Sequence, residues 1–126
     1  MSRFVVIGGA NVGIMGITDD PLRPQDSNPG TIRTTLGGVG RNVAENLARL
    51  GENVSLVSVV GDDSFGRWIL EQGQACGVDM RWVQSLPDQR TSAFLAILDS
   101  DHDLHSAIAD MTILNQLDQA CLRPVL

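Results

Sequence analysis

Short apolar runs and helical apolar periodicities alternate along the chain, separated by glycine, proline and aspartate. Runs of β-branched residues predict buried strands, and apolar residues spaced three or four apart predict helices. Strands are expected at residues 4–7, 54–60 and 78–82, and helices at 37–50, 64–76 and from Thr112 onward. This alternation favours an α/β domain with a mostly parallel sheet and helices on its faces.

Two segments do not fit the alternation. Residues 12–36 hold short β-prone pieces between turns rich in aspartate and proline, and residues 91–98 and 104–109 predict a β-hairpin around a polar five-residue loop. We expect both segments to lie outside the parallel core. The chain ends directly after a predicted helix, where the alternation would supply another strand, so we expect an incomplete domain. We expect residues 54–60 or a neighbouring strand to form an unpaired edge and promote self-association or a homo-oligomer.

Composition narrows the choice of partners. The chain has 126 residues, 43% of them hydrophobic, which suits one globular domain. Its net charge is −6, and it contains arginine but no lysine. Nucleic acid and membrane surfaces are not expected partners, because binding them needs clustered positive charge or about 20 apolar residues in a row. Cys76 and Cys121 lie too far apart for a zinc motif and give no disulfide framework, so a cytoplasmic location is expected.

The first glycine-rich segment, Gly8-Gly9-Ala10-Asn11-Val12-Gly13, follows the first predicted strand and has the spacing of a dinucleotide-binding turn. That mechanism needs a helix to begin there, so that the helix N-terminus meets the pyrophosphate. Glycines and prolines in the residues that follow oppose a helix. We therefore expect no dinucleotide site at this turn.

The second segment is more specific. Gly37-Gly38-Val39-Gly40-Arg41-Asn42 opens a predicted helix, and Gly51 and Gly61 follow at set distances. This pattern resembles the N-terminal signature of the ribokinase-like, or phosphofructokinase-B type, carbohydrate kinases, over essentially the whole chain. The resemblance implies a ribokinase-like three-layer α/β fold in which residues 12–36 and 91–109 form a small β lid over a sugar. The competing interpretation makes those segments plain edge strands.

The same resemblance implies a set of substrate-binding residues: Asn11, Gly38, Gly40 and Asn42. Glycines let a backbone approach a ligand closely, and an amide such as that of Asn42 can both donate to and accept from sugar hydroxyls. The alternative is that Asn42 only occupies the first turn of its helix. Gly13 stands where the family has an aspartate, which implies weaker sugar binding. Asp63 is expected to cap a helix, not to act as a catalytic acid.

The family implies phosphoryl transfer from ATP, with magnesium, to a sugar or nucleoside hydroxyl. Residues 26–30 and 109–111 resemble the pseudouridine kinases within it, so pseudouridine is the leading substrate. The family's second signature, Asp-Thr-x-Gly-Ala-Gly-Asp, which supplies an anion hole and a proton acceptor, is missing from the sequence. No catalytic residue is therefore expected here, and the chain alone should be inactive. The alternative function is a non-catalytic remnant or interaction module that associates through its lid or sheet edge.

Other polar residues offer little chemistry. His102 and His105 are too few ligands for a metal site, and the aspartates at 99, 101 and 103 lack the glycine and glutamate of a calcium loop. We expect no metal site in these residues.

Overall fold

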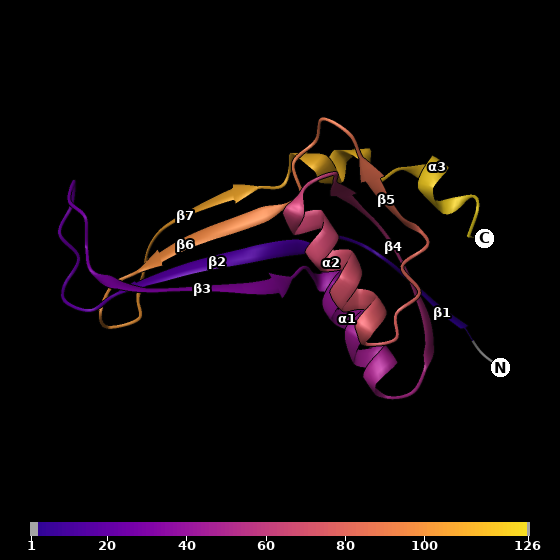
Figure 1. The fold of residues 1–126 in the computed structure, drawn as a ribbon, viewed down its shortest axis with the longest axis horizontal. Helices are drawn as coiled ribbons and strands as arrows, with labels where there is room; N and C mark the ends of the chain where they lie inside the picture. Colours follow the sequence, from indigo (N-terminus) through magenta and orange to yellow (C-terminus); the bar gives the residue numbers. More distant parts are fainter. Residues whose placement is uncertain (1–2, 126) are drawn as a thin grey trace.

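The computed structural model describes residues 3–125, and its strands form two separate sheets. The first sheet is parallel and has the order β1-β4-β5. In Figure 1 it lies beside the two long helices, while the second sheet extends away from them to the left. The strands of the first sheet are β1 (Arg3–Ile7), β4 (Asn53–Gly61) and β5 (Val83–Leu86).

Strand β4 forms the centre of the core, because its residues from Val54 to Gly61 are all buried. One of its faces packs against helices α1 (Val39–Arg49) and α2 (Ser64–Ala75), and the other packs against residues of the C-terminal segment. A strand covered on both faces reads as a continuous apolar run, which is why the sequence predicted it well. Of the two alternatives for an unpaired edge, residues 54–60 do not form one, because β4 is paired on both sides; its neighbours β1 and β5 are the edges.

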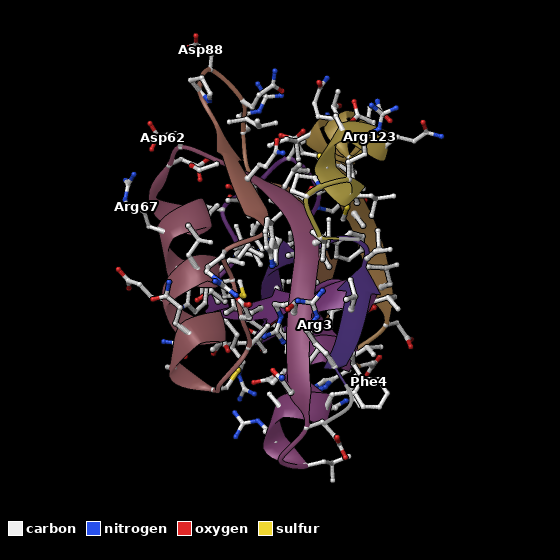
Figure 2. All side chains as sticks on the ribbon, turned by 90° about the vertical axis from the view of Figure 1, so that its right-hand side faces the viewer. Arg3, Phe4, Asp62, Arg67, Asp88 and Arg123 are labelled. Carbon is white, nitrogen blue, oxygen red and sulfur yellow. The ribbon has the colours of Figure 1, made fainter. Side chains whose placement is uncertain are left out.

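Strand β1 leaves one long side open. Phe4 and Ile7 are 42% and 51% exposed, and Figure 2 shows Arg3 and Phe4 at this edge of the sheet. The Arg3 guanidinium donates to the backbone oxygen of Val125 at 2.9 Å, which ties the edge to the C-terminal segment. At the left of Figure 2, Asp62 and Arg67 point into solvent beside each other, with Arg67 Nη1 3.5 Å from Asp62 Oδ1.

The second sheet is built from the two segments that did not fit the alternation. Its order is β3-β2-β6-β7, with β2 antiparallel to β3, parallel to β6, and β6 antiparallel to β7. The predicted hairpin is therefore present, and residues 12–36 hold two strands of eight residues each instead of short pieces. The strands are β2 (Asn11–Thr18), β3 (Gly30–Gly37), β6 (Ala93–Leu98) and β7 (Leu104–Asp110).

The strand expected at residues 78–82 is wrong. Val78 and Met80 are buried and belong to the core beside α2, but only Asp79 bridges to β4, and the amide of Val83 donates to the Met80 carbonyl in a turn. The alternating burial came from packing against a helix and not from strand pairing. Strand β5 begins only at Val83.

The single helix expected from Thr112 onward is also wrong. The segment forms a 3₁₀ helix, η1 (Thr112–Gln116), followed by the one-turn helix α3 (Gln119–Leu122). The Asp118 carboxylate accepts from the amide of Ala120 at 3.0 Å, so it caps a new helix and separates the two. Within residues 3–125 no helix is long and apolar enough to cross a membrane.

Candidate functional site

The two glycine segments meet where β1 ends and α1 begins. The amide of Arg41 donates to the Gly9 carbonyl at 3.1 Å, and a Cβ built at Gly40 would lie 2.8 Å from the Gly8 Cα. Gly38 has a φ of +95°, and a Cβ there would overlap the Gly9 carbonyl oxygen. Side chains at these positions would push the helix away from the strand. Residues 11–18 form strand β2, so the helix that a dinucleotide-binding turn needs does not begin here.

Asn11 is the first residue of β2 and is half-buried. Its Nδ2 lies 3.9 Å from the Met111 Sδ, a weak acceptor, and its Oδ1 is buried without a hydrogen-bond partner among residues 3–125. That oxygen lies against Gly37, where a Cβ would come within 2.8 Å of it. A buried, unpaired acceptor costs about 1–3 kcal/mol, so turning this oxygen out to a ligand that donates a hydrogen bond would be favourable.

Asn42 lies in the first turn of α1 and is exposed. Its Oδ1 accepts from the Arg41 Nη2 at 2.7 Å, and the same nitrogen lies 3.1 Å from Glu45 Oε2 and 3.4 Å from the Leu36 carbonyl oxygen. The side-chain amide of Asn42 is therefore held from one side. The amide was expected to donate and accept, and in the structure its oxygen already accepts one hydrogen bond, from Arg41.

The sequence did not single out Arg41, whose side chain the structure places against Asn42. The residue is only 8% exposed, and its charge is balanced by Glu45, which also pairs with Arg49 at 3.0 Å. The hydrogen bond from Arg49, with the charge of Arg41, holds the pKa of the Glu45 carboxyl below its usual range against the opposing effect of burial. A glutamate four residues after an arginine on one helix was the available signal.

Gly13 lies two residues beyond Asn11 on β2, so both positions face the same side of the second sheet. Gly13 is paired with Thr35 of β3 and with Phe94 of β6, and a Cβ at Gly13 would lie 3.0 Å from the Thr35 Oγ1. Val12, on the other side of β2, is buried in the core. The sheet therefore presents Asn11, Gly13, Thr35 and Phe94 on one face.

Asp63 caps α2, as the sequence predicted. Its carboxylate accepts from the Gly66 amide at 2.8 Å, from the Thr91 amide at 2.9 Å and from the Thr91 hydroxyl at 2.6 Å. Burial raises the pKa of Asp63, but these hydrogen bonds outweigh it and hold the pKa below its ordinary value. Because Thr91 leads into β6, this contact joins the core to the second sheet.

The opposite face of the second sheet carries a hollow of about 500 Å³ under residues 19–29. Ile32 of β3, Ile97 of β6 and Ser106 of β7 line it, and His105 lies at the same hollow. Within the described part of the chain no three His, Cys, Asp or Glu side chains gather as metal ligands. The sheet thus separates this hollow from the face that carries Asn11.

Comparison with known proteins decides the family. The model of the pfkB family carbohydrate kinases matches residues 1–124. The chain belongs to the PfkB carbohydrate kinase family. It is 42% identical over 113 residues to the pseudouridine kinase of Escherichia coli, covering 90% of this chain and 36% of that protein. It is 36% identical over 123 residues to a guanosine-inosine kinase of Exiguobacterium acetylicum, covering 98% of this chain and 41% of that protein.

The fold agrees with the family. A ribokinase from Arabidopsis thaliana, solved with ribose and ATP, superposes with a TM-score of 0.76 at 29% identity, covering 85% of this chain and 35% of the ribokinase. The expected ribokinase-like α/β fold is thereby confirmed. This PfkB chain spans between about a third and two fifths of the length of the relatives it matches.

Proposed function

We propose that this PfkB chain forms the substrate-binding part of a kinase that transfers the γ-phosphoryl group of ATP to a sugar or nucleoside hydroxyl. Pseudouridine is the leading substrate. The observation that carries the proposal is the buried, unpaired Oδ1 of Asn11 against Gly37, beside the glycine turn that starts α1. Two relatives that act on nucleosides by name, a pseudouridine kinase and a guanosine-inosine kinase, support the substrate class.

The residues take distinct parts in this proposal. Asn11 and Asn42 bind sugar hydroxyls, and Gly38 and Gly40 let the backbone come close enough for both amides to reach one ligand. Residues 12–36 and 91–109 form the lid, whose face with Gly13 and Thr35 covers the sugar. A lid that closes over the sugar would exclude water from the reaction.

ATP and magnesium enter the proposal from outside these residues. The ribokinase complex with ribose and ATP supports ATP as co-substrate. For magnesium the described residues offer no cluster of three or more candidate ligands, so no side chain is assigned to it and no step is derived through it. The sequence lacks the Gly-Ala-Gly-Asp segment that would carry the anion hole and proton acceptor, so we propose that the chain alone transfers no phosphate. We place the protein in the cytoplasm, with no nucleic-acid or membrane partner.

Isothermal calorimetry tests the binding part of the proposal. Pseudouridine and ribose should bind weakly, with dissociation constants of about 1 mM, because a few hydrogen bonds are all that these residues supply. Asn42→Ala and Asn11→Ala should each weaken binding about three- to tenfold, the range of one neutral hydrogen bond. Asn46→Ala, a change of another exposed asparagine on α1, is the matched control and should leave binding unchanged. Binding as tight as that of the wild type in both site variants would contradict the proposal.

A second candidate function is association with another protein chain. Ile32 and Ile108 are 75% and 66% exposed on the sheet face opposite Asn11, and Leu95 and Ile97 are each 39% exposed beside them. Such a contiguous apolar face is typical of an interface. We propose that this face or the open β1 edge mediates a homo-oligomer.

A further inference from the structure

The Asn42 amide has an orientation that its neighbour Arg41 imposes. We propose that Arg41 is a positioning residue, which turns Asn42 so that its two N–H groups, and not its carbonyl oxygen, meet the substrate. This inference rests on the proposed sugar or nucleoside site. It makes the two N–H groups of Asn42 the atoms that face the ligand.

The chemistry of guanidinium fixes this assignment. Arg41 has N–H donors and no acceptor, so the Asn42 atom 2.7 Å from its Nη2 has to be the carbonyl oxygen. The two ends of an amide are often hard to tell apart by shape, but here the partner decides between them. Nδ2 then lies on the side away from Arg41, on an exposed residue, and no acceptor among residues 3–125 bonds to it.

The surroundings hold Arg41 in place. Its side chain is 9% exposed, and a charge so enclosed is stable only when it is paired. Glu45 supplies the opposite charge at 3.1 Å and is itself held by Arg49 at 3.0 Å, while the Leu36 carbonyl at the end of β3 lies 3.4 Å away. The guanidinium is thereby fixed between β3 and α1, and Asn42 is fixed with it.

The two asparagines then offer complementary chemistry. Asn42 presents N–H donors, whereas the unpaired buried group of Asn11 is an acceptor, Oδ1. A sugar with neighbouring hydroxyls can accept from the Asn42 amide and, once the Asn11 side chain turns its buried oxygen outward, donate to Asn11. The ligand class is therefore a diol in which the atom that contacts Asn42 needs a lone pair and not a hydrogen.

Calorimetry with pseudouridine as the probe tests the donor role. Asn42→Asp keeps an acceptor for Arg41 but removes both N–H donors, so it should lose binding as fully as Asn42→Ala. Arg41→Met should weaken binding about three- to tenfold, the range of one neutral hydrogen bond, and should have no further effect in the Asn42→Ala background. Arg41→Lys should recover most of the affinity, and Arg67→Met, a change of an exposed arginine on α2, should have none of these effects.

Two results would overturn the proposal. Asn42→Asp binding as tightly as the wild type would make Asn42 an acceptor, and Arg41→Met weakening a residual binding equally in the Asn42→Ala background would make Arg41 merely structural. Nitrogen relaxation of the Asn42 side-chain amide tests the positioning without any ligand. The amide should be rigid in the wild type and mobile in Arg41→Met, and equal mobility in both would also overturn the proposal. A rigid amide in a wild type that binds no sugar would contradict the proposed function and leave the positioning role supported.

Discussion

Gly13 and Thr35 face each other across β2 and β3, on the side of the second sheet that carries Asn11. A Cβ at position 13 would lie 3.0 Å from the Thr35 Oγ1, so a side chain fits only if the hydroxyl moves by a few tenths of an ångström. A threonine hydroxyl can turn and donate to a carboxylate placed beside it. The aspartate that the family has at this position would therefore fit beside Thr35.

We predict that Gly13→Asp tightens the binding of pseudouridine or ribose at least tenfold, because a hydrogen bond to a charged acceptor contributes about 1.5–3 kcal/mol. Calorimetry measures the affinity. Gly13→Ala is the control, since it adds the Cβ beside Thr35 without the carboxylate and reports the steric cost alone. If Gly13→Asp binds no better than Gly13→Ala, position 13 lies outside the sugar site.

Single residues also show how far the sequence could lead. The glycine motifs pointed to Asn11 and Asn42 as binding residues, which stays a prediction. They did not point to Arg41, because its proposed role depends on a 2.7 Å contact between adjacent side chains and on burial in the folded chain. The unpaired Oδ1 of Asn11 likewise depends on how closely Gly37 approaches it.

At the scale of elements, the junction of β1 and α1 positions both asparagines. Gly38 and Gly51 have nearly the same backbone, with φ values of +95° and +87°, but only Gly38 is crowded: nothing lies within 4 Å of a Cβ at Gly51. Comparing Gly38 with Gly51 therefore distinguishes two reasons for a glycine: a left-handed backbone, which both have, and close approach of another segment, which only Gly38 of the two has.

We predict that Gly51→Ala lowers the free energy of unfolding by about 1–2 kcal/mol, the cost of a left-handed conformation. Gly38→Ala should cost about 1–3 kcal/mol more, because its Cβ overlaps the Gly9 carbonyl and forces α1 to shift. Urea unfolding measures both variants. Equal losses would show that α1 does not depend on the close approach to β1.

A second prediction at this scale concerns pH. The folded-state pKa of Asp63 lies below 3.8, so its contribution to stability is present above that pH and is lost as the pH falls toward the folded pKa. Asp63→Asn should be less stable than the wild type at pH 7 and lose less stability between pH 5 and pH 3. Chemical unfolding at several pH values measures this. Asp62→Asn, at the neighbouring exposed carboxylate, is the control for the loss of one negative charge at this place. If Asp63→Asn and the wild type lost equal stability between pH 5 and pH 3, the lowered pKa of Asp63 would not be a source of the pH dependence.

The accuracy of the predicted elements followed the strength of their patterns. β4, α1 and α2 have long apolar patterns with clear glycine or aspartate boundaries, and they were predicted within a few residues. The failures at residues 78–82 and after Thr112 have a common cause. Residues 78–82 pack beside α2, and the segment after Thr112 packs on β4. The apolar spacing of each segment reflects that packing and not its own hydrogen bonds.

At the scale of the whole molecule, two surfaces stay open. One is the outer face of the second sheet with Ile32 and Ile108, and the other is the β1 edge with Phe4 and Ile7. Figure 1 shows that the second sheet extends well away from the helices, so no helix covers its outer part.

We predict concentration-dependent self-association through the outer sheet face. The double variant Ile32→Lys with Ile108→Lys should shift the chain toward monomer in sedimentation velocity, because it places two like charges in the apolar face. Leu50→Lys is the control, since Leu50 is 78% exposed at the end of α1 and lies outside this face. Association that survives the double variant would point to the β1 edge instead.

The last prediction concerns catalysis. The chain alone should release no ADP from ATP in the presence of pseudouridine, ribose or other nucleosides, because sugar-binding groups cannot replace groups that act on the phosphoryl group. Adding a C-terminal half from a related PfkB kinase should give measurable turnover, and the Gly13→Asp variant should give more, because the bound sugar is then better oriented. A coupled ADP-release assay measures both. Turnover by the chain alone would contradict the proposal that the groups acting on the phosphoryl group lie outside this chain. No turnover even by the Gly13→Asp variant with the added C-terminal half would favour the alternative function, a non-catalytic interaction module.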